Sequence, residues 1–209
     1  PQPEHGGDIN SLRQFVNVRS DQEWWLLIGW LVSVFRVGYP YAVLLLIGEQ
    51  GSAKSTVAKM LKAITDPNAA PLRRPATNEG DLIIAATNSH VVAYDNLSRL
   101  SESMSDAVCV VSTGGGLGKR RLYTDSDEEL LSVMRPVILT AINNIATRGD
   151  LADRGISLTL QIPEIRRRER ELWEAFNEEA PYLLGALLDG AVCGLKNISS
   201  IAIDDAPRM

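Results

Sequence analysis

The stretch LLLIGEQGSAKSTVAKMLKAI, residues 44–64, decides the fold class. It consists of an apolar run, a glycine-rich turn that carries one lysine, and a segment with apolar residues at i, i+3, i+4 and i+7. The apolar run predicts a buried strand over residues 42–47, and the periodic segment predicts a helix over residues 54–64. A turn of this composition between a strand and a helix is typical of a phosphate-binding loop.

The turn fits the pattern GxxxxGK[ST] at Gly48, Lys54 and Ser55, and Ala53 replaces its second glycine. Glycines let the backbone turn sharply enough to point its N–H groups at a phosphate chain, and the helix N-terminus adds positive charge. Lys54 can reach the β- and γ-phosphates, and the Ser55 hydroxyl can ligate Mg²⁺. The alternative, a strand-to-helix turn with an incidental lysine, is disfavoured by the complete strand, loop and helix context. We therefore expect ATP and Mg²⁺ as cofactors, with nucleotide contacts from Gly48, Glu49, Gln50, Gly51, Ser52, Ala53, Lys54, Ser55 and Thr56.

A second apolar run, HVVAYD at residues 90–95, predicts a buried strand that ends in Asp95. ATPases with such a loop hold their Mg²⁺ partly through an acidic residue at the end of a neighbouring strand. Asp95 and Ser55 are therefore the predicted metal ligands, although an aspartate at a strand end can also be a turn former. The next residue, Asn96, can orient a water molecule but cannot take its proton. Glu49 is the second candidate for activating water.

The remaining pattern alternates strands and helices. Helices are expected at residues 21–37 and 101–112. Residues 164–195 are expected to form two helical pieces, with Pro181 in the first turn of the second. Residues 80–88 are ambiguous and favour a short helix. Strands are expected at 136–142 and 155–160, and a hairpin at 119–124 and 129–134. Buried strands separated by helices indicate an α/β fold with a parallel sheet covered on both faces. We divide the chain into an N-terminal helical segment (1–40), the core (41–162) and a helical lid (163–209).

The composition is that of a globular domain with one core: 209 residues, 45% of them hydrophobic, and a net charge of −5. The only two cysteines, Cys109 and Cys193, have no CxxC spacing, which argues against a disulfide framework or a zinc site and favours the cytoplasm. The apolar run at 24–35 is too short to span a bilayer, and no signal peptide is visible. Because the first residue is not methionine, we expect an excised domain of a larger protein.

The acidic net charge argues against a surface that coats nucleic acid. Three basic clusters nevertheless stand out, at Arg73-Arg74, Lys119-Arg120-Arg121 and Arg166-Arg167-Arg168. Each is either a solvated surface or a DNA contact.

Taken together, these residues resemble an AAA+ ATPase of the branch that superfamily 3 helicases share with minichromosome maintenance helicases. The turn GEQGSAKS resembles the minichromosome maintenance loop, which also carries alanine before its lysine. The order of the apolar helix, the turn, VVAYDNLS, TGGG, the hairpin and RPVILTAINN resembles phage and prophage primase-helicase modules. The resemblance covers residues 10–195 and implies an AAA+ P-loop core with a pre-sensor-1 hairpin and a small helical lid.

The resemblance also assigns roles to individual residues. It places Thr140 at the sensor-1 position, with Asn143 or Asn144 as substitutes. The segment DLADRGISLTL is similar to the arginine-finger segment of ring helicases and points to Arg154, with Arg148 as second choice. An arginine finger stabilises charge on the neighbouring subunit's γ-phosphate, which implies a homo-oligomeric ring, a hexamer. Without the resemblance, Arg154 would be interpreted as a surface charge at a helix C-terminus.

The hairpin corresponds to the element that these helicases insert into the central pore. Its predicted tip, residues 125–128, is acidic, so DNA contact is assigned to Lys119, Arg120 and Arg121 on the rising strand. The lid lacks a clear sensor-2 arginine, for which Arg166–Arg168 are loose candidates. The resemblance implies an ATP-hydrolysing ring motor, a DNA helicase or translocase for replication of a mobile element, with a primase domain or partner. The alternatives are an ATP-binding switch or assembly scaffold with slow hydrolysis, and a protein-remodelling ATPase.

Overall fold

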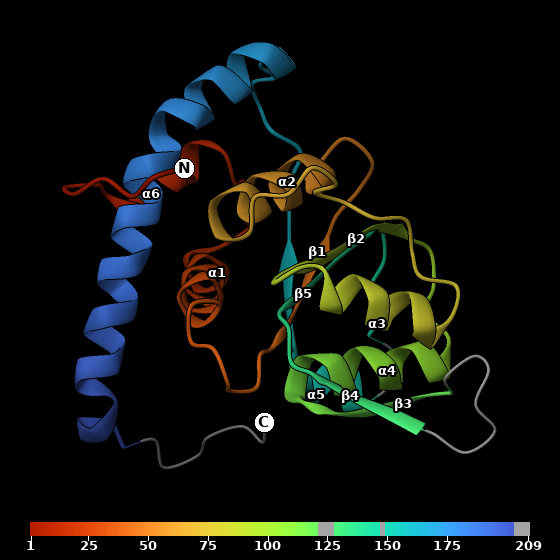
Figure 1. Cartoon of the computed structure of the whole chain (residues 1–209). Coiled ribbons are helices and arrows are strands. Elements are labelled where there is room, and N and C mark those ends of the chain that lie inside the picture. The colour runs from red at the N-terminus through yellow and green to blue at the C-terminus, as the bar shows by residue number, and fades with distance from the viewer. Residues whose placement is uncertain (121–127, 147–148, 203–209) are drawn as a thin grey trace.

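The structure, a computed structural model, describes residues 1–120, 128–146 and 149–202. Its centre is a four-stranded parallel sheet with the strand order β2-β5-β1-β6 (Figure 1). The strands are β1 (Val43–Ile47), β2 (Val92–Leu97), β5 (Val137–Ala141) and β6 (Gly155–Thr159). All four therefore end at the same edge of the sheet, where the glycine-rich turn begins.

Helices cover both faces of this sheet. Leu44 and Leu46 of β1 point to one side, where they pack with η1 (Ile9–Gln14), α1 (Asp21–Ser33), α2 (Lys54–Thr65) and α6 (Glu169–Asn197). Val43 and Leu45 point to the other side, against α3 (Glu79–Thr87), α4 (Glu102–Thr113) and α5 (Gly149–Arg154). Because successive side chains of a strand face opposite ways, a strand buried on both faces is apolar throughout, as β1 is. The predicted α/β class is confirmed.

The start of α1 follows from two side chains with capping-box spacing. Ser20 Oγ accepts a hydrogen bond from the backbone N–H of Glu23 (3.2 Å). The buried Glu23 carboxylate accepts from the backbone N–H groups of Arg19 (3.0 Å) and Thr159 (3.3 Å). The first turn of α1 is thereby tied to the end of β6. The helix ends at Ser33, four residues before the predicted end at residue 37.

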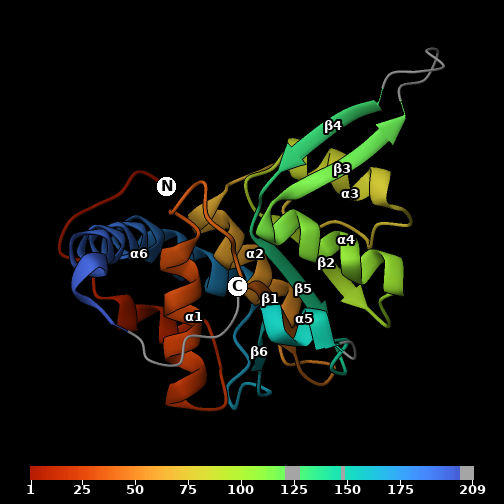
Figure 2. The ribbon, with the colours of Figure 1, turned by 90° about the horizontal axis from the view of Figure 1, so that it is seen from below.

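The hairpin consists of β3 (Gly115–Arg120) and β4 (Glu128–Val133), which are antiparallel and extend away from the body of the molecule (Figure 2). The prediction that its first strand begins at residue 119 was wrong. Gly114, at a φ of 84°, ends α4, and ladder pairing with β4 already begins at Gly115. Glycine has a weak strand preference, so the sequence pattern concealed this start. Most of the predicted acidic tip lies outside the described residues.

The last helix, α6, runs unbroken from Glu169 to Asn197, so the prediction of two pieces was wrong. Pro181 lies in its interior, where a proline removes one backbone hydrogen bond. Buried residues precede and follow the proline, Phe176 on one side and Leu183 and Leu187 on the other, and this packing holds the helix together. No helix among the described residues is long and apolar enough to cross a membrane.

The N-terminal residues cross α6 at a glycine. The backbone N–H of Glu4 donates to the carbonyl of Pro181 (3.0 Å), and the Glu4 backbone lies directly over Gly185. A Cβ atom added to Gly185 would collide with the Glu4 carbonyl oxygen, whereas one added to Gly194 would meet nothing within 4 Å. Gly185 is therefore required by contact with the N-terminal segment, and Gly194 is not.

The contrast between these two glycines gives a test of the packing. Gly185→Ala should lower the melting temperature, because the new methyl group displaces the Glu4 backbone. Gly194→Ala should raise the free energy of unfolding by up to about 1 kcal/mol, because alanine costs less conformational entropy in a helix. Thermal unfolding of both variants measures the difference. Equal melting temperatures would contradict the placement of residues 1–8 on α6.

Candidate nucleotide-binding site

The glycine-rich turn joins the end of β1 to the start of α2. A Cβ atom on Gly48 would lie 2.5 Å from the carbonyl oxygen of Leu160 and 2.6 Å from Ser52 Oγ, so only glycine fits. Gly51 has a φ of 90°, which also favours glycine. Ala53 adopts the left-handed conformation, with φ 61° and ψ 20°. The motif has a glycine at this position, and glycine adopts the left-handed conformation freely. Alanine can adopt the same conformation, but at a cost of about 1–2 kcal/mol.

The Lys54 side chain folds back over the turn. Its Nζ donates hydrogen bonds to the carbonyl oxygens of Gly48 (2.7 Å) and Glu49 (2.8 Å). Burial lowers the pKa of Lys54, and the charge of Asp95 opposes this by raising it. The ammonium group therefore lies inside the loop, where phosphate oxygens could replace the two carbonyls as acceptors.

Three elements meet at the carboxylate of Asp95. Ser55 Oγ, on α2, donates to Asp95 Oδ1 at 2.8 Å, and Thr140 Oγ1, on β5, donates to the same oxygen at 2.6 Å. The wholly buried Thr140 hydroxyl also accepts the backbone N–H of Asn96 (2.8 Å). Asp95 and Ser55, the two predicted metal ligands, are thus adjacent. Their hard oxygen atoms suit Mg²⁺, which usually takes one or two protein ligands together with substrate phosphates.

The position of Asp95 within β2 was predicted only approximately. The strand covers Val92–Leu97 instead of residues 90–95, and its pairing with β5 is irregular between Tyr94 and Leu97. Asn96 lies in this irregularity with a φ of 57°, a conformation that asparagine tolerates better than most residues. The irregular backbone places Asn96 on the surface beside Asp95.

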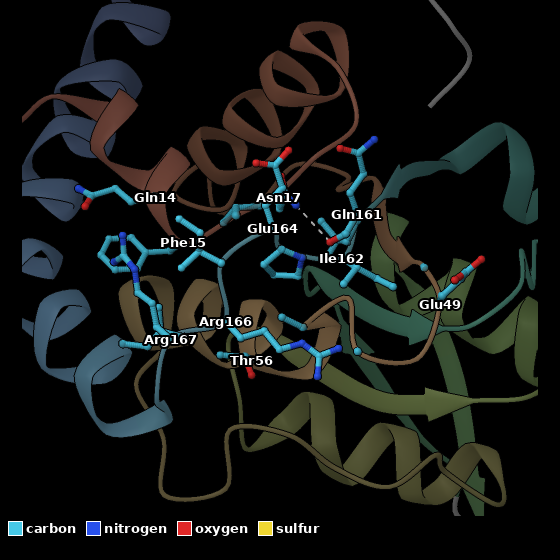
Figure 3. A pocket seen from close by; sticks show the side chains of 18 of the residues that line it. Gln14, Phe15, Asn17, Glu49, Thr56, Gln161, Ile162, Glu164, Arg166 and Arg167 are labelled. Atoms are coloured by element: carbon cyan, nitrogen blue, oxygen red, sulfur yellow. Dashed lines mark hydrogen bonds between the residues drawn. The ribbon is translucent and has the colours of Figure 1, made fainter.

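A cavity of about 1130 Å³ opens beside the turn (Figure 3). Gly48, Glu49, Gly51, Ala53 and Thr56 form its turn side. Two other segments form the remaining walls. One is residues 13–17, which comprises the last two residues of η1 and the three that follow it. The other is residues 159–167, which comprises the last residue of β6 and the segment after it. Apolar side chains line the cavity, among them Val16, Ile162 and Ile165 of these walls and Leu172 of α6. This volume exceeds that of ordinary ligand pockets and is sufficient for a nucleoside triphosphate.

The two outer walls are joined to each other. The backbone N–H of Gln161 donates to the carbonyl oxygen of Asn17 (2.9 Å), and Asn17 Nδ2 donates to the Gln161 carbonyl oxygen (3.3 Å). An antiparallel bridge between Val18 and Leu160 continues this contact. None of these residues was predicted as part of the site. Their segments carry no motif, and only the fold brings them to the turn.

Arg166 also belongs to this cavity. Its Nη2 lies 3.5 Å from the position that a Cβ atom on Gly51 would take, and Figure 3 shows its side chain directed towards the turn. Arg167 lines the cavity too, whereas Arg168 does not and precedes α6 as its N-cap residue. The run of three arginines was the only sequence signal. It could not distinguish a cavity residue from its neighbours.

Arg154 is not brought to the cavity. It ends α5 and forms an ion pair with Asp150 (2.8 Å). Because it directly precedes β6, it lies at the end of the sheet opposite the turn. A five-residue strand at roughly 3.3 Å per residue puts about 16 Å between these ends.

The remaining candidates either do not line the cavity or lie outside the described residues. Asn143 and Asn144 follow β5 on the surface, and Lys119 and Arg120 lie in β3. Arg121 and Arg148 lie outside the described residues.

The described residues contain no group of three or more His, Cys, Asp or Glu side chains that could hold a metal ion. A metal at Asp95 and Ser55 would therefore need oxygen atoms from a bound phosphate chain or from water. This requirement agrees with the way Mg²⁺ enters nucleotide sites, where it arrives with the phosphates.

The α/β fold is similar to those of solved structures, one of which is described as a helicase. Similar solved structures include the A form apo structure of the NrS-1 C-terminal region 305–718, with a TM-score of 0.59 and 13% identity over 89% of this chain and 46% of that chain. Another is the structure described as SCCmec type IV Cch, active helicase, with a TM-score of 0.50 and 14% identity over 93% of this chain and 40% of that chain. The chain spans less than half the length of these proteins, and such identities establish the fold alone.

The particular family follows from a match over residues 9–206 to the actinomycete integrative conjugative element replication proteins. The chain belongs to this family. No curated protein matches the chain in sequence. The predicted setting, replication of a mobile element by a protein with a helicase-like fold, is confirmed at this level.

The buried hydroxyl of Thr140 gives a stability test of the site. Thr140→Val keeps the shape of the side chain but leaves the N–H of Asn96 without its acceptor and Asp95 with Ser55 as its remaining side-chain donor. We expect the free energy of unfolding in urea to fall by about 1–3 kcal/mol. Thr140→Ser keeps the hydroxyl and loses one methyl group, which should cost about 1 kcal/mol. A valine variant as stable as the parent protein would show that this network contributes nothing.

Proposed function

We propose that the chain is the ATP-hydrolysing motor module of its replication protein and acts on DNA as a helicase or translocase. One observation carries the proposal: the Ser55 hydroxyl and the Asp95 carboxylate lie 2.8 Å apart beside the glycine-rich turn. A turn with backbone N–H groups, a lysine, a hydroxyl and a carboxylate is the set that nucleoside triphosphate hydrolysis requires. The adjoining cavity supplies room for the rest of the nucleotide.

ATP would lie with its phosphates on the turn and its base in the apolar part of the cavity, against Val16 and Ile162. Lys54 contacts the turn at Gly48, Arg166 approaches it at Gly51, and the two side chains would share the phosphate charge. Ser55 and Asp95 would hold Mg²⁺, which supplies charge neutralisation at the phosphate oxygens. The Thr140 hydroxyl donates a hydrogen bond to the Asp95 carboxylate and thereby holds this carboxylate in place.

The arrangement at Asn96 favours a second candidate function. Asn96 is exposed beside Asp95, where it can orient a water molecule for attack on the γ-phosphate but cannot accept its proton. Glu49 lines the cavity and is the one carboxylate within the turn itself, which makes it the alternative base. If neither residue activates water, the chain is an ATP-binding switch or assembly scaffold with slow hydrolysis.

The position of Arg154 supports assembly into a ring. An arginine side chain cannot bridge the length of β6 to the nucleotide of its own chain, so any catalytic role must act on a neighbouring subunit. In that role Arg154 would leave Asp150 and contact the neighbour's γ-phosphate. We propose a homo-oligomeric ring, a hexamer, with DNA contacts from Lys119, Arg120 and Arg121 and a primase domain or partner alongside.

Two substitutions separate nucleotide binding from turnover. Lys54→Ala should weaken ATP-Mg²⁺ binding by about 10- to 100-fold, because it removes a charge-assisted contact to phosphate worth about 1.5–3 kcal/mol. Arg154→Ala should bind ATP like the parent protein but lose DNA-stimulated hydrolysis. A mixture of the two variants should regain part of this activity, because it forms interfaces with an intact lysine and an intact arginine. Fluorescence titration and phosphate release measure the two properties.

Arg168→Ala is the control for loss of a surface arginine, because Arg168 lies outside the cavity. It should bind and hydrolyse ATP like the parent protein. ATP binding by Lys54→Ala at parental affinity would refute the nucleotide site. Full turnover by assembled Arg154→Ala would refute the shared interface while leaving the nucleotide site intact.

The choice between motor and switch depends on Asn96. If water activation limits turnover, Asn96→Asp should raise the hydrolysis rate, since a positioned base contributes about 10²–10⁴-fold, and ATP affinity should stay nearly unchanged. The measurement is phosphate release with DNA present, at concentrations where rings form. Rapid parental hydrolysis that falls in Asn96→Asp would mean that another base acts, and Glu49→Gln would then be the next variant. Parent and variant that both stay inactive would favour the switch.

A further inference from the structure

The end of the sheet opposite the proposed nucleotide site carries an arginine–tyrosine pair in which Arg36 is partly buried and Tyr39 is exposed. It lies in the connection between α1 and β1, residues 34–42. The guanidinium carbon of Arg36 is 3.5 Å from the centroid of the Tyr39 ring. Half of the Tyr39 surface remains exposed, and so does 71% of the neighbouring Val37. The pair therefore presents an aromatic ring and a positive charge together at the surface.

Within the described part of the chain, Arg36 has no anionic partner. Its Nε is buried and has no hydrogen-bond acceptor among the described residues. The ion pairs found in this part of the chain involve other arginines and a lysine. A guanidinium held by an aromatic face alone keeps its charge available for an external anion.

The pair is held in a fixed position by the layer beneath it. The Tyr41 hydroxyl donates to the carbonyl oxygen of Arg36 (3.1 Å), and the Tyr41 ring packs edge-on against His90 at 6.4 Å between centroids. His90 Nε2 in turn lies 2.9 Å from the carbonyl oxygen of Val34. Burial raises the pKa of Tyr41, and the nearby positive charge of Arg135 lowers it. The pair is thus preorganised, with further positive charge close by.

This layer is continuous with the root of the hairpin. The backbone N–H of Tyr41 donates to the carbonyl oxygen of Ser112 (2.8 Å), and that of Arg135 donates to Val111 (2.8 Å). Arg135 Nε also donates a hydrogen bond to the carbonyl oxygen of Ala86, near the end of α3 (3.0 Å). Strand β3 begins three residues after Ser112, and Figures 1 and 2 both show the α1–β1 connection beside the hairpin root.

We propose that Arg36 and Tyr39 form a stacking platform for single-stranded DNA at this end of the sheet, beside the hairpin. The Arg36 guanidinium lies over one face of the Tyr39 ring, so a nucleotide base would stack on the other face, while the unpaired positive charge attracts the backbone phosphate. The combination suits a nucleic-acid strand because both halves of a nucleotide, base and phosphate, find a complementary group. The inference rests on the proposed function in one respect, namely that DNA is the ligand.

The test is fluorescence anisotropy with a short labelled oligothymidylate strand and no ATP, measured over a series of salt concentrations. Arg36→Ala and Tyr39→Ala should each weaken binding at least about fivefold. Arg36→Ala should also lower the slope of log affinity against log salt by about 1, because one phosphate contact is lost. Tyr39→Ala should leave that slope unchanged, and Tyr39→Phe, which keeps the ring, should bind within about twofold of the parent.

Two surface residues of α6 provide matched controls. Tyr182 is 45% exposed, close to the 50% of Tyr39, and Arg170 is an exposed arginine paired with Glu174. Tyr182→Ala and Arg170→Ala should bind the strand like the parent. A strand containing 5-iododeoxyuridine should crosslink to the peptide that contains Tyr39 on irradiation.

Failure of this inference is distinguishable from failure of the proposed function. Parental DNA affinity in Arg36→Ala and Tyr39→Ala, with no crosslink at Tyr39, would overturn the platform even if ATP binds. Such a result would assign the pair to a protein interface, where arginine and tyrosine are also frequent. Loss of DNA binding in these variants, in a protein that binds no ATP, would support the platform and refute the motor.

Discussion

The carboxylate of Asp95 is the group on which the site depends. It accepts hydrogen bonds from Ser55 on α2 and from Thr140 on β5, while the backbone beside it donates to the same threonine hydroxyl. A partly buried carboxylate is stable only when its lone pairs are satisfied, so these contacts hold the turn, β2 and β5 in one arrangement. The parallel sheet makes this possible, because all its strands end at the same edge.

The two ends of the sheet carry different functional side chains. Its carboxyl end carries the turn and the cavity, while its amino end carries the hairpin root, the Arg36–Tyr39 pair and Arg154. A strand of five residues, at roughly 3.3 Å each, is a short rigid connection between them. A change in contacts at one end can therefore reach the other through β1 and β5 without passing through a flexible linker. Under the proposed function, the sheet would link the nucleotide site at one end to the DNA contacts at the other.

Local patterns predicted the elements whose signals are strong. The turn and α2 follow from glycine placement and helical periodicity, and α3 was correctly favoured as a short helix. Predictions failed where tertiary contacts outweigh local preference. The hairpin was expected to begin at residue 119, but pairing with β4 already draws Gly115 into β3. Pro181 was expected to start a helix, but packing on both sides of it carries α6 through.

The sequence by itself determined the α/β class, the glycine-rich turn between β1 and α2, and the two residues, Ser55 and Asp95, that meet beside it. These follow from the spacing of a few residue types whose local geometry is nearly obligatory. Only the tertiary structure decided the outer walls of the cavity, the place of Arg166 over the turn and the separation of Arg154 from it. Those features join segments far apart in the chain, whose proximity depends on how helices pack on the sheet and leaves no trace in local periodicity.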